Sequence, residues 1–236
     1  MVTKVTQVAP DLVLCTGDLT ATATDAEFAG ALELLSPLTV AYPFLCIPGN
    51  HDVYTGESVG RYSEYFGANE VVSVSTHGEI DIVRVDVCHP DWLSRGELGP
   101  VGLEKLDAAL AKSERPALIA IHYPLRDRRG ERYGPPTRAL SDADAVETVL
   151  LKHARVKWLV HGHEHHGFRT EIPRAGNPIT VIDPGAGGYA YLPERGRTAH
   201  FCVYEFAGST LVSVERYRFD GKAFLAEPGG AFATGG

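Results

Sequence analysis

The segment PFLCIPGNHD, residues 43–52, decides how this chain is interpreted. Its first half is an almost continuous apolar run, which is typical of a strand buried on both faces of a sheet. The run stops at Gly49, and three side chains with metal-binding or acid–base chemistry follow at once: Asn50, His51 and Asp52. In open α/β sheets ligands bind beyond the carboxyl ends of the strands, so a functional site is expected here.

Other apolar runs end in the same way. Each is followed by a loop with ligand-type side chains: Leu12–Cys15 by Thr-Gly-Asp18, Ala117–Ile121 by His122, and Val156–Val160 by HGHEH at residues 161–165. One aspartate or histidine after a strand carries little information. Four such loops in one chain predict a single site at the edge where the strand ends meet.

The segments between these runs carry helical patterns. Thr24-Asp-Ala-Glu27 is a capping box, Ser141-Asp-Ala-Asp144 resembles one, and Leu103, Leu106 and Leu110 form an amphipathic stripe. Consecutive strands without helices are expected later in the chain, at Glu79–Val87, Phe168–Ile172, Ile179–Asp183, His200–Phe206 and Leu211–Phe219. This order predicts an α/β fold with a two-sheet β-sandwich of mixed strands flanked by helices. We expect a single domain at residues 1–227 and a flexible tail at 228–236.

Composition limits the classes of partner. The 236 residues include 22 Lys and Arg against 30 Asp and Glu, a formal net charge of −8. Such a surface repels nucleic-acid polymers and anionic membranes, so neither is expected as a partner. A hydrophobic content of 44% without a long apolar run excludes a disordered or membrane-spanning chain. The first residues lack the apolar core of a signal peptide, which predicts a cytoplasmic location.

Four motifs carry a resemblance to a known family. Gly17-Asp18, Gly49-Asn50-His51-Asp52, His122 and Gly162-His163-Glu164-His165 resemble, in order and spacing, four of the five motifs of calcineurin-like metallophosphoesterases. The segment GDLT at residues 17–20 is similar to the bacterial class III cyclic-nucleotide phosphodiesterase and glycerophosphodiesterase branch. The resemblance implies hydrolysis of phosphodiester or phosphomonoester bonds of a small substrate by metal-bound hydroxide.

The same resemblance implies a dinuclear metal site. It assigns Asp18 as the bridging carboxylate, Asn50, His122 and His163 to the second metal, His165 to the first, His51 as general acid or hydrogen-bond donor, and Asp52 as its orienter. Imidazole, amide and carboxylate ligands suit divalent transition metals such as Mn, Fe or Zn. Two such ions would also supply the positive charge that a chain at −8 lacks.

The chain departs from the family at its start. The family opens with a strand that ends in D-x-H and holds the first metal, whereas residues 1–10 contain neither Asp nor His. We therefore expect a sandwich that lacks its first strand and a single fully liganded metal site. One explanation is a fragment that lacks roughly 25–30 residues, one strand and one helix. The alternative is a chain of this length that is mononuclear, or a catalytically impaired member acting as a metal-binding interaction scaffold. The retention of five ligands and His51 favours the fragment.

An arginine-rich loop follows His122. Arg126, Arg128 and Arg129 are candidates to bind a substrate phosphate, in a stretch up to residue 138 that contains two further arginines. A solvated, mobile loop is the equal alternative. His161 is expected to be a loop histidine, His166 a solvated one, and Asp183 to cap a turn. The sequence leaves the substrate, the metal identity and the oligomeric state open.

Overall fold

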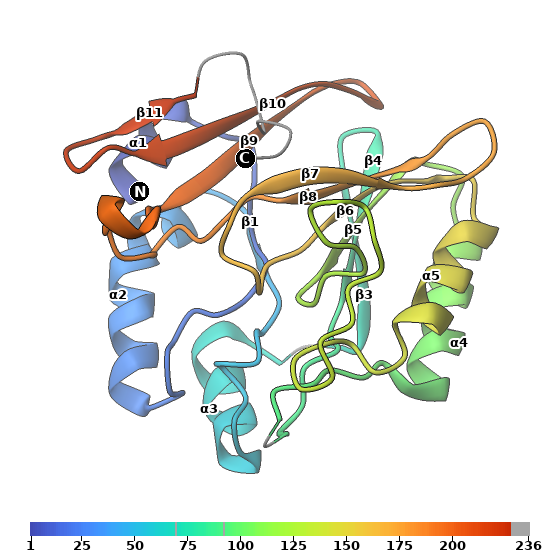
Figure 1. Cartoon of the computed structure of the whole chain (residues 1–236), viewed down its shortest axis with the longest axis horizontal. Coiled ribbons are helices and arrows are strands. Elements are labelled where there is room, and N and C mark those ends of the chain that lie inside the picture. The colour runs from blue at the N-terminus through green and yellow to red at the C-terminus, as the bar shows by residue number, and fades with distance from the viewer. Residues whose placement is uncertain (69, 92, 228–236) are drawn as a thin grey trace.

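A six-stranded mixed sheet forms the centre of the computed structural model, which describes residues 1–68, 70–91 and 93–227 (Figure 1). The predicted tail at residues 228–236 lies outside the described residues. The strand order is β3-β4-β5-β6-β8-β7, with β3 at Val72–His77, β4 at Ile80–Val85, β5 at Ala117–Ile121, β6 at Val156–Val160, β7 at Phe168–Ile172 and β8 at Ile179–Asp183. The four inner strands are parallel, and the edge strands β3 and β7 are antiparallel to their neighbours.

Two smaller sheets lie against one face of this sheet. A parallel pair contains β1 (Val13–Cys15) and β2 (Phe44–Cys46), and an antiparallel sheet contains β9 (His200–Ala207), β10 (Thr210–Phe219) and β11 (Phe224–Ala226). The second layer is therefore split, which differs from the predicted pair of sheets. Among the described strands, β1 pairs only with β2, and β9 pairs only with β10. No described strand pairs with both β1 and β9 and so joins the two small sheets.

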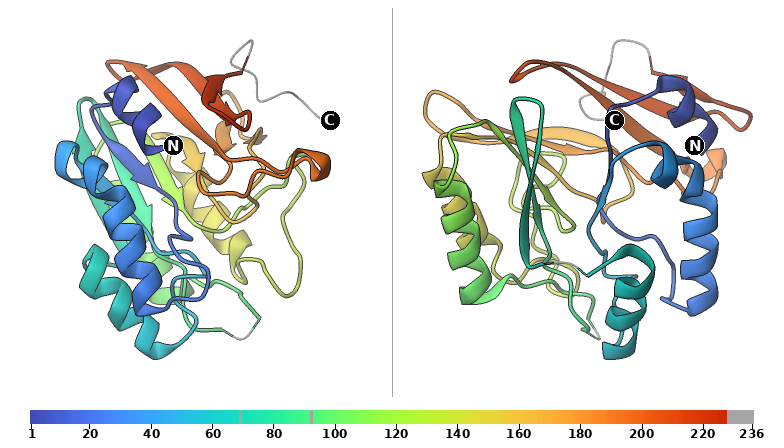
Figure 2. Two further views of the ribbon diagram at one scale, coloured as in Figure 1. Left: turned by 90° about the vertical axis from the view of Figure 1, so that its left-hand side faces the viewer. Right: turned by 180° about the vertical axis from the view of Figure 1, so that it is seen from behind.

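Helices cover the outside of both layers. They are α1 (Val2–Val8), α2 (Asp25–Ala41), α3 (Gly56–Phe66), α4 (Gly99–Ala111) and α5 (Ala143–Lys152), with a 3₁₀ turn at Pro193–Arg195. Helices α4 and α5 lie on one side of the molecule, and α2 and α3 on the other (Figures 1 and 2). In the residues that the structure describes, no helix combines the length and apolarity needed to cross a lipid bilayer.

The start of α2 confirms the predicted capping box, because Glu27 N donates to Thr24 Oγ1 at 3.3 Å and Thr24 N donates to Glu27 Oε2 at 3.0 Å. The second predicted capping box, at residues 141–144, is wrong. Helix α5 begins at Ala143 without a side-chain cap, because the Asp142 carboxylate accepts the N–H groups of Leu98 and Gly99 at the start of α4.

The main core lies between the central sheet and helices α4 and α5. All five residues of β5 are buried, as the apolar run predicts. A second cluster joins the opposite face of the sheet to Leu14 of β1, Leu45 of β2 and Tyr204 of β9. Strands β1 and β2 are mostly half-buried, contrary to the expectation of burial on both faces, because they belong to the outer layer.

Candidate active site

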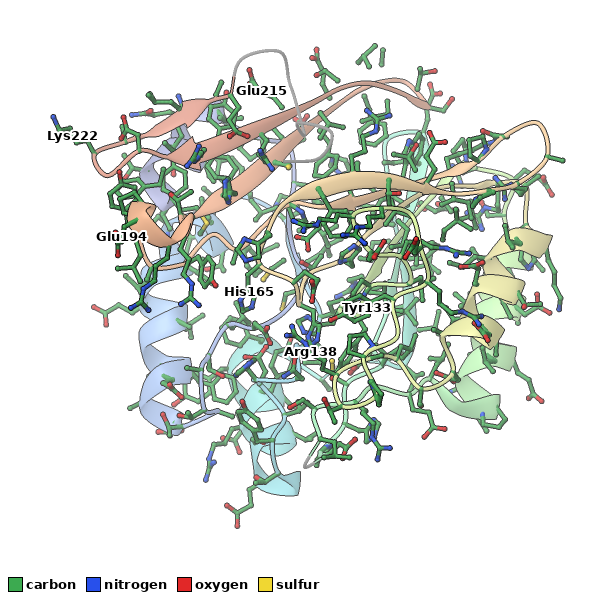
Figure 3. All side chains as sticks on the ribbon, viewed as in Figure 1. Tyr133, Arg138, His165, Glu194, Glu215 and Lys222 are labelled. Atoms are coloured by element: carbon green, nitrogen blue, oxygen red, sulfur yellow. The ribbon has the colours of Figure 1, made fainter. Side chains whose placement is uncertain are left out.

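The four predicted loops meet at the carboxyl ends of β1, β2, β5 and β6, around a cavity of about 510 Å³. Figure 3 places Arg138 and His165 near the middle of the molecule. The cavity is lined by Asp18, Asn50, His51, Ser94, Thr137, Arg138, His163, Glu164, His165, His166 and Tyr189. Five of the predicted site residues are therefore brought together, and His122 contacts Asn50 beneath them.

Two of the predicted ligands contact the Asn50 amide. Asn50 Oδ1 lies 2.9 Å from His163 Nδ1 and 3.0 Å from His122 Nε2. His122 Nε2 lies 3.5 Å from Asp18 Oδ1. Donor atoms bound to one ion at about 2.0–2.2 Å are separated by roughly 3.0–3.5 Å when their angles are between square and tetrahedral. The contacts of Asn50 with His122 and His163, and of His122 with Asp18, lie within this range.

The orientation of the His122 ring supports this interpretation. Its Nδ1 lies 2.7 Å from the Thr16 carbonyl oxygen and can donate a proton to it. Nε2 is then left with its lone pair toward Asn50 and Asp18. A hydrogen bond from the second ring nitrogen to a carbonyl is the usual way in which a metal-binding histidine is held in the correct tautomer.

The two oxygens of Asp18 face different partners. Oδ1 accepts the N–H of His51 at 3.1 Å and faces His122, while Oδ2 lies 3.5 Å from His165 Nε2. The two oxygens of Asp18 therefore contact histidines of two different loops. On the Oδ2 side Asp18 and His165 are two donors, fewer than a transition-metal ion requires. Within the described part of the chain, no three His, Cys, Asp or Glu side chains, Asp18, His122 and His163 included, are arranged to hold an ion by themselves.

The protonation states suit metal binding. Burial opposes ionisation of Asp18, but His122, His165 and His51 nevertheless hold its pKa well below the usual range. Burial lowers the pKa of His163 to about 3, and the nearby His122 and Arg138 act in the same direction. An ionised carboxylate and a neutral imidazole are the forms that ligate metals, so little proton release is required.

The backbone is strained around the cavity. Six described residues other than glycine have positive φ, and four of them line it: Asp18 at 58°, Ser94 at 53°, His163 at 72° and His165 at 62°. Such conformations persist where the surrounding structure enforces them, and they cluster at functional sites. The loops also touch at Gly49, where an added Cβ would lie 2.1 Å from Asp18 Oδ1.

The Asp52 carboxylate joins two loops instead of contacting the His51 ring. It is fully buried and accepts hydrogen bonds from Gly49 N and Thr20 N, both at 2.9 Å, and from Leu19 N at 3.2 Å. Asp52 is therefore placed as a positioning residue. Its side chain turns back because residues 49–52 form a turn in which Asp52 N donates to the Gly49 carbonyl oxygen.

The groups that orient His51 were missed from the sequence. His51 Nδ1 lies 2.8 Å from the Ala21 carbonyl oxygen and 2.7 Å from Tyr54 Oη. Tyr54 comes three residues after His51, just before α3. This spacing was a signal, but an isolated tyrosine near a histidine has many ordinary explanations.

The arginine-rich loop reaches the cavity through Arg138. Arg138, rather than Arg126, Arg128 or Arg129, is the arginine among the described lining residues. Arg126 instead forms an ion pair with Glu147 of α5. A phosphate-binding role for Arg126, Arg128 and Arg129 stays a prediction.

Arg138 is held at the cavity by Glu164. Its Nη2 lies 3.2 Å from Glu164 Oε1, which also accepts a hydrogen bond from Tyr133 Oη at 2.6 Å. Arg138 Nε lies 3.4 Å from His163 Nε2. The guanidinium is thus placed beside the predicted metal ligands.

One acidic and one basic side chain beneath the site, Asp183 and His161, form a buried pair. Asp183 accepts the N–H of Gly185 at 2.7 Å, as expected for a turn cap. Its other oxygen lies 3.7 Å from His161 Nδ1, and both side chains are fully buried. His161 is a loop histidine, as expected, and it is buried because the HGHEH loop leaves β6 inside the protein. Burial lowers the pKa of His161 to about 4.

A family model for calcineurin-like phosphoesterases matches residues 2–167. The chain belongs to this family. The resemblance seen in the motifs is thus confirmed, and the chain is also distantly related to bacterial class III cyclic-nucleotide phosphodiesterases.

Two curated relatives illustrate this distant relationship. A "probable cyclic nucleotide phosphodiesterase" of Vesicomyosocius okutanii is 27% identical over 180 residues, which cover 76% of this chain and 72% of the relative. The "3',5'-cyclic adenosine monophosphate phosphodiesterase CpdA" of Haemophilus influenzae is 24% identical over 162 residues, which cover 68% of this chain and 57% of the relative. The second match therefore spans little more than half of that protein.

Solved structures show the same fold at low identity. A dimetal phosphatase from Danio rerio superposes with a TM-score of 0.62 at 15% identity, covering 96% of this calcineurin-like phosphoesterase and 83% of the other chain. A purple acid phosphatase from yellow lupin superposes with a TM-score of 0.59 at 14% identity, covering 90% and 43%. These similarities support a mixed α/β fold with helix-flanked sheets.

Proposed function

We propose that this calcineurin-like phosphoesterase hydrolyses a P–O ester bond of a small phosphodiester in a metal-dependent reaction. The observation that carries the proposal is the contact of Asn50 Oδ1 with His122 Nε2 and His163 Nδ1, and of His122 Nε2 with Asp18 Oδ1, at a cavity that Asp18, Asn50 and His163 line. A divalent ion bound there supplies Lewis-acid stabilisation of phosphoryl oxygens and lowers the pKa of a water molecule.

Asp18, Asn50, His122 and His163 would hold this ion, and the mixture of nitrogen and oxygen donors suits Mn, Fe or Zn. His165 and the second oxygen of Asp18 would contribute to a neighbouring ion. That second set requires further donors beyond those two. This shortage is the observation that favours the alternative function, a metal-binding scaffold without turnover.

His51 is placed to assist the leaving group. A proton on Nδ1 can be donated to the Ala21 carbonyl oxygen and shared with Tyr54 Oη, since both lie within 2.8 Å. Nε2 is then the nitrogen available to a substrate in the cavity. When His51 is protonated, Nε2–H can donate to the departing ester oxygen, which is the role of a general acid.

Arg138 would bind the phosphate or a second anionic group of the substrate. Its guanidinium can donate two parallel hydrogen bonds to phosphate oxygens, and Glu164 limits its movement. Because the chain carries a net charge of −8, cations gathered at the cavity are needed to attract an anionic substrate. The names of the curated relatives suggest 3',5'-cyclic nucleotides as the first substrates to examine.

The direct test is hydrolysis of bis(4-nitrophenyl) phosphate by the metal-free chain after addition of Mn, Fe or Zn. We expect metal-stimulated turnover, lost in Asn50→Ala and retained in His153→Ala, whose histidine is paired with Asp107 away from the cavity. Cyclic AMP, a glycerophosphodiester and 4-nitrophenyl phosphate would then define the ester class. Metal binding by equilibrium dialysis without turnover in any arm would refute the enzyme and support the scaffold.

A further inference from the structure

The cavity beside the predicted metal ligands has two chemically different ends. Those of its lining residues that follow strands of the central sheet are arranged in the strand order β4-β5-β6-β8, because these four strands are parallel. Ser94 follows β4 and Arg138 follows β5, whereas His166 follows β6 and Tyr189 follows β8. Hydroxyl and guanidinium groups therefore stand at one end of the cavity, and two ring-bearing side chains stand at the other.

The Tyr189 ring is held by contacts on several sides. Its centroid lies 5.2 Å from that of His165 and 5.8 Å from that of His166, at interplanar angles of 61° and 78°. The Arg197 guanidinium carbon lies 5.5 Å from the same centroid, which is within the range of a cation–π contact. A tight turn holds Arg197 there, since Leu192 and Arg197 exchange both backbone hydrogen bonds at 3.0 Å. The ring is thus ordered in advance, which lowers the entropy cost of binding a ligand against it.

The packing of the fold does not account for this end of the cavity. Tyr189 is half-buried and belongs to none of the hydrophobic clusters of the described core, and His166 is exposed. In the part of the chain that the structure describes, the Tyr189 hydroxyl has no hydrogen-bond partner and Arg197 forms no ion pair. Ring surface that borders a cavity without serving the core is typical of ligand-binding sites, whose walls are rich in aromatic side chains.

We propose that Tyr189, together with His166, forms a subsite for a planar aromatic ring of the substrate and selects ring-bearing phosphoesters. The inference rests on the proposed function, because the predicted metal ligands must bind the phosphate of the same molecule. A ring packed against Tyr189, either offset-stacked or edge-to-face, gains an attraction beyond the area that it buries. A cavity of about 510 Å³ is within the range that accepts a molecule with both a phosphate and a ring. The anionic part of the substrate is drawn instead toward Arg138, at the opposite end.

Calorimetric titration in the presence of Mn²⁺ tests this subsite with matched pairs of ligands. AMP and ribose 5-phosphate share the sugar phosphate and differ by the base, and phenyl phosphate and methyl phosphate form a second pair that separates a simple aryl ring from a nucleobase. We expect the ring-bearing member of at least one pair to bind the wild-type chain about tenfold more tightly, on the order of one base–aromatic stack. Tyr189→Leu should abolish this preference, and Tyr189→Phe should retain it.

The matched control is Tyr191→Leu, in the same loop. Tyr191 is 39% exposed, but its ring contacts Phe219 and its hydroxyl donates to the Asp220 carbonyl oxygen, so the preference should be unchanged. The affinity for the ring-free ligands reports any indirect effect through His165, and Tyr189→Leu should not alter it.

A wild-type chain without a preference in either pair would overturn the proposal. So would a Tyr189→Leu variant that loses affinity equally for both members of the preferred pair, because the ring would then act through His165 rather than on the ligand. A preference that depends on Tyr189, in a chain that turns over no phosphoester, would refute the proposed function and support the ring subsite.

Discussion

Replacing Asp52 by Asn tests whether a buried carboxylate builds the metal site by joining two loops. Oδ1 accepts the N–H and the hydroxyl of Thr20, and Oδ2 accepts the N–H groups of Leu19 and Gly49. An amide keeps one of the two acceptor oxygens. Its NH₂ group is expected to face Thr20, because the Thr20 hydroxyl can rotate and become an acceptor.

The expected loss of stability follows from the hydrogen bonds that the amide cannot form. The N–H of Thr20 loses its acceptor in a buried position, which costs about 1–3 kcal/mol, and the remaining bonds lose the strength that a charged acceptor gives. We expect Asp52→Asn to destabilise the chain by roughly 2–3 kcal/mol, within the 5–15 kcal/mol typical of a folded domain. The variant therefore stays folded.

The metal affinity should fall by a larger factor than the stability of the fold suggests. Asp18 and Asn50 stand on the two loops that Asp52 joins, so their donor atoms separate when the contact weakens. Residues that support metal ligands typically change affinity by about 10–100-fold. Urea unfolding followed by circular dichroism measures the stability, and calorimetric titration with Mn or Zn measures the affinity.

The matched control is Asp142→Asn. This carboxylate also joins two segments, by accepting the N–H groups of Leu98 and Gly99, but it touches no predicted ligand. We expect a similar loss of stability with unchanged metal affinity. Wild-type metal affinity in Asp52→Asn, or an equal loss in both variants, would refute the positioning role.

Three further outcomes are expected. Gly49→Ala should abolish metal binding in a folded chain, measured by equilibrium dialysis, because the new Cβ would lie 2.1 Å from Asp18 Oδ1. Tyr54→Phe removes one hydrogen bond from His51, worth about 1 kcal/mol, and should lower kcat roughly fivefold at unchanged KM in steady-state kinetics. Burial raises the pKa of Asp86 to about 7, so the folded chain holds this proton more tightly than the unfolded chain does. The resulting stabilisation is complete below about pH 4 and lost as the pH rises through 7, so Asp86→Asn should be about 3–5 kcal/mol more stable than wild type at pH 8 and equal to it at pH 4 in urea unfolding.

Apolar runs and polar loop residues predict the centre of this fold well. The runs at Ala117–Ile121 and Val156–Val160 coincide with β5 and β6, because strands buried on both faces have an unmistakable composition. Strand β3 was missed, because VSVSTH alternates small polar and apolar residues and lies at an edge. Helix α3 was missed as well, since its cap at Thr55 is followed by glycine and serine.

The candidate site, too, could be predicted from the sequence only in part. The residue types of Asp18, Asn50 and His163 predict ligands, and their meeting follows from parallel strand ends. The partners of those residues depend on turn geometry that no spacing rule describes. The contacts of Asp52 with backbone N–H groups and of Tyr54 with His51 depend on the turn at residues 49–52, so the sequence alone does not predict them.

The division of the second layer into small sheets has a consequence for how the site opens. Asp18 and Asn50 follow β1 and β2, a pair of three-residue strands, whereas His122 and His163 follow β5 and β6 in the six-stranded core. The four donors thus come from two bodies of very different local stability, and the short pair is the unit expected to detach first. An ion bound by all four donors would hold the β1–β2 pair against the six-stranded sheet. Amide hydrogen exchange in β1 and β2 should then slow on metal addition, while exchange in β5 and β6 is unchanged.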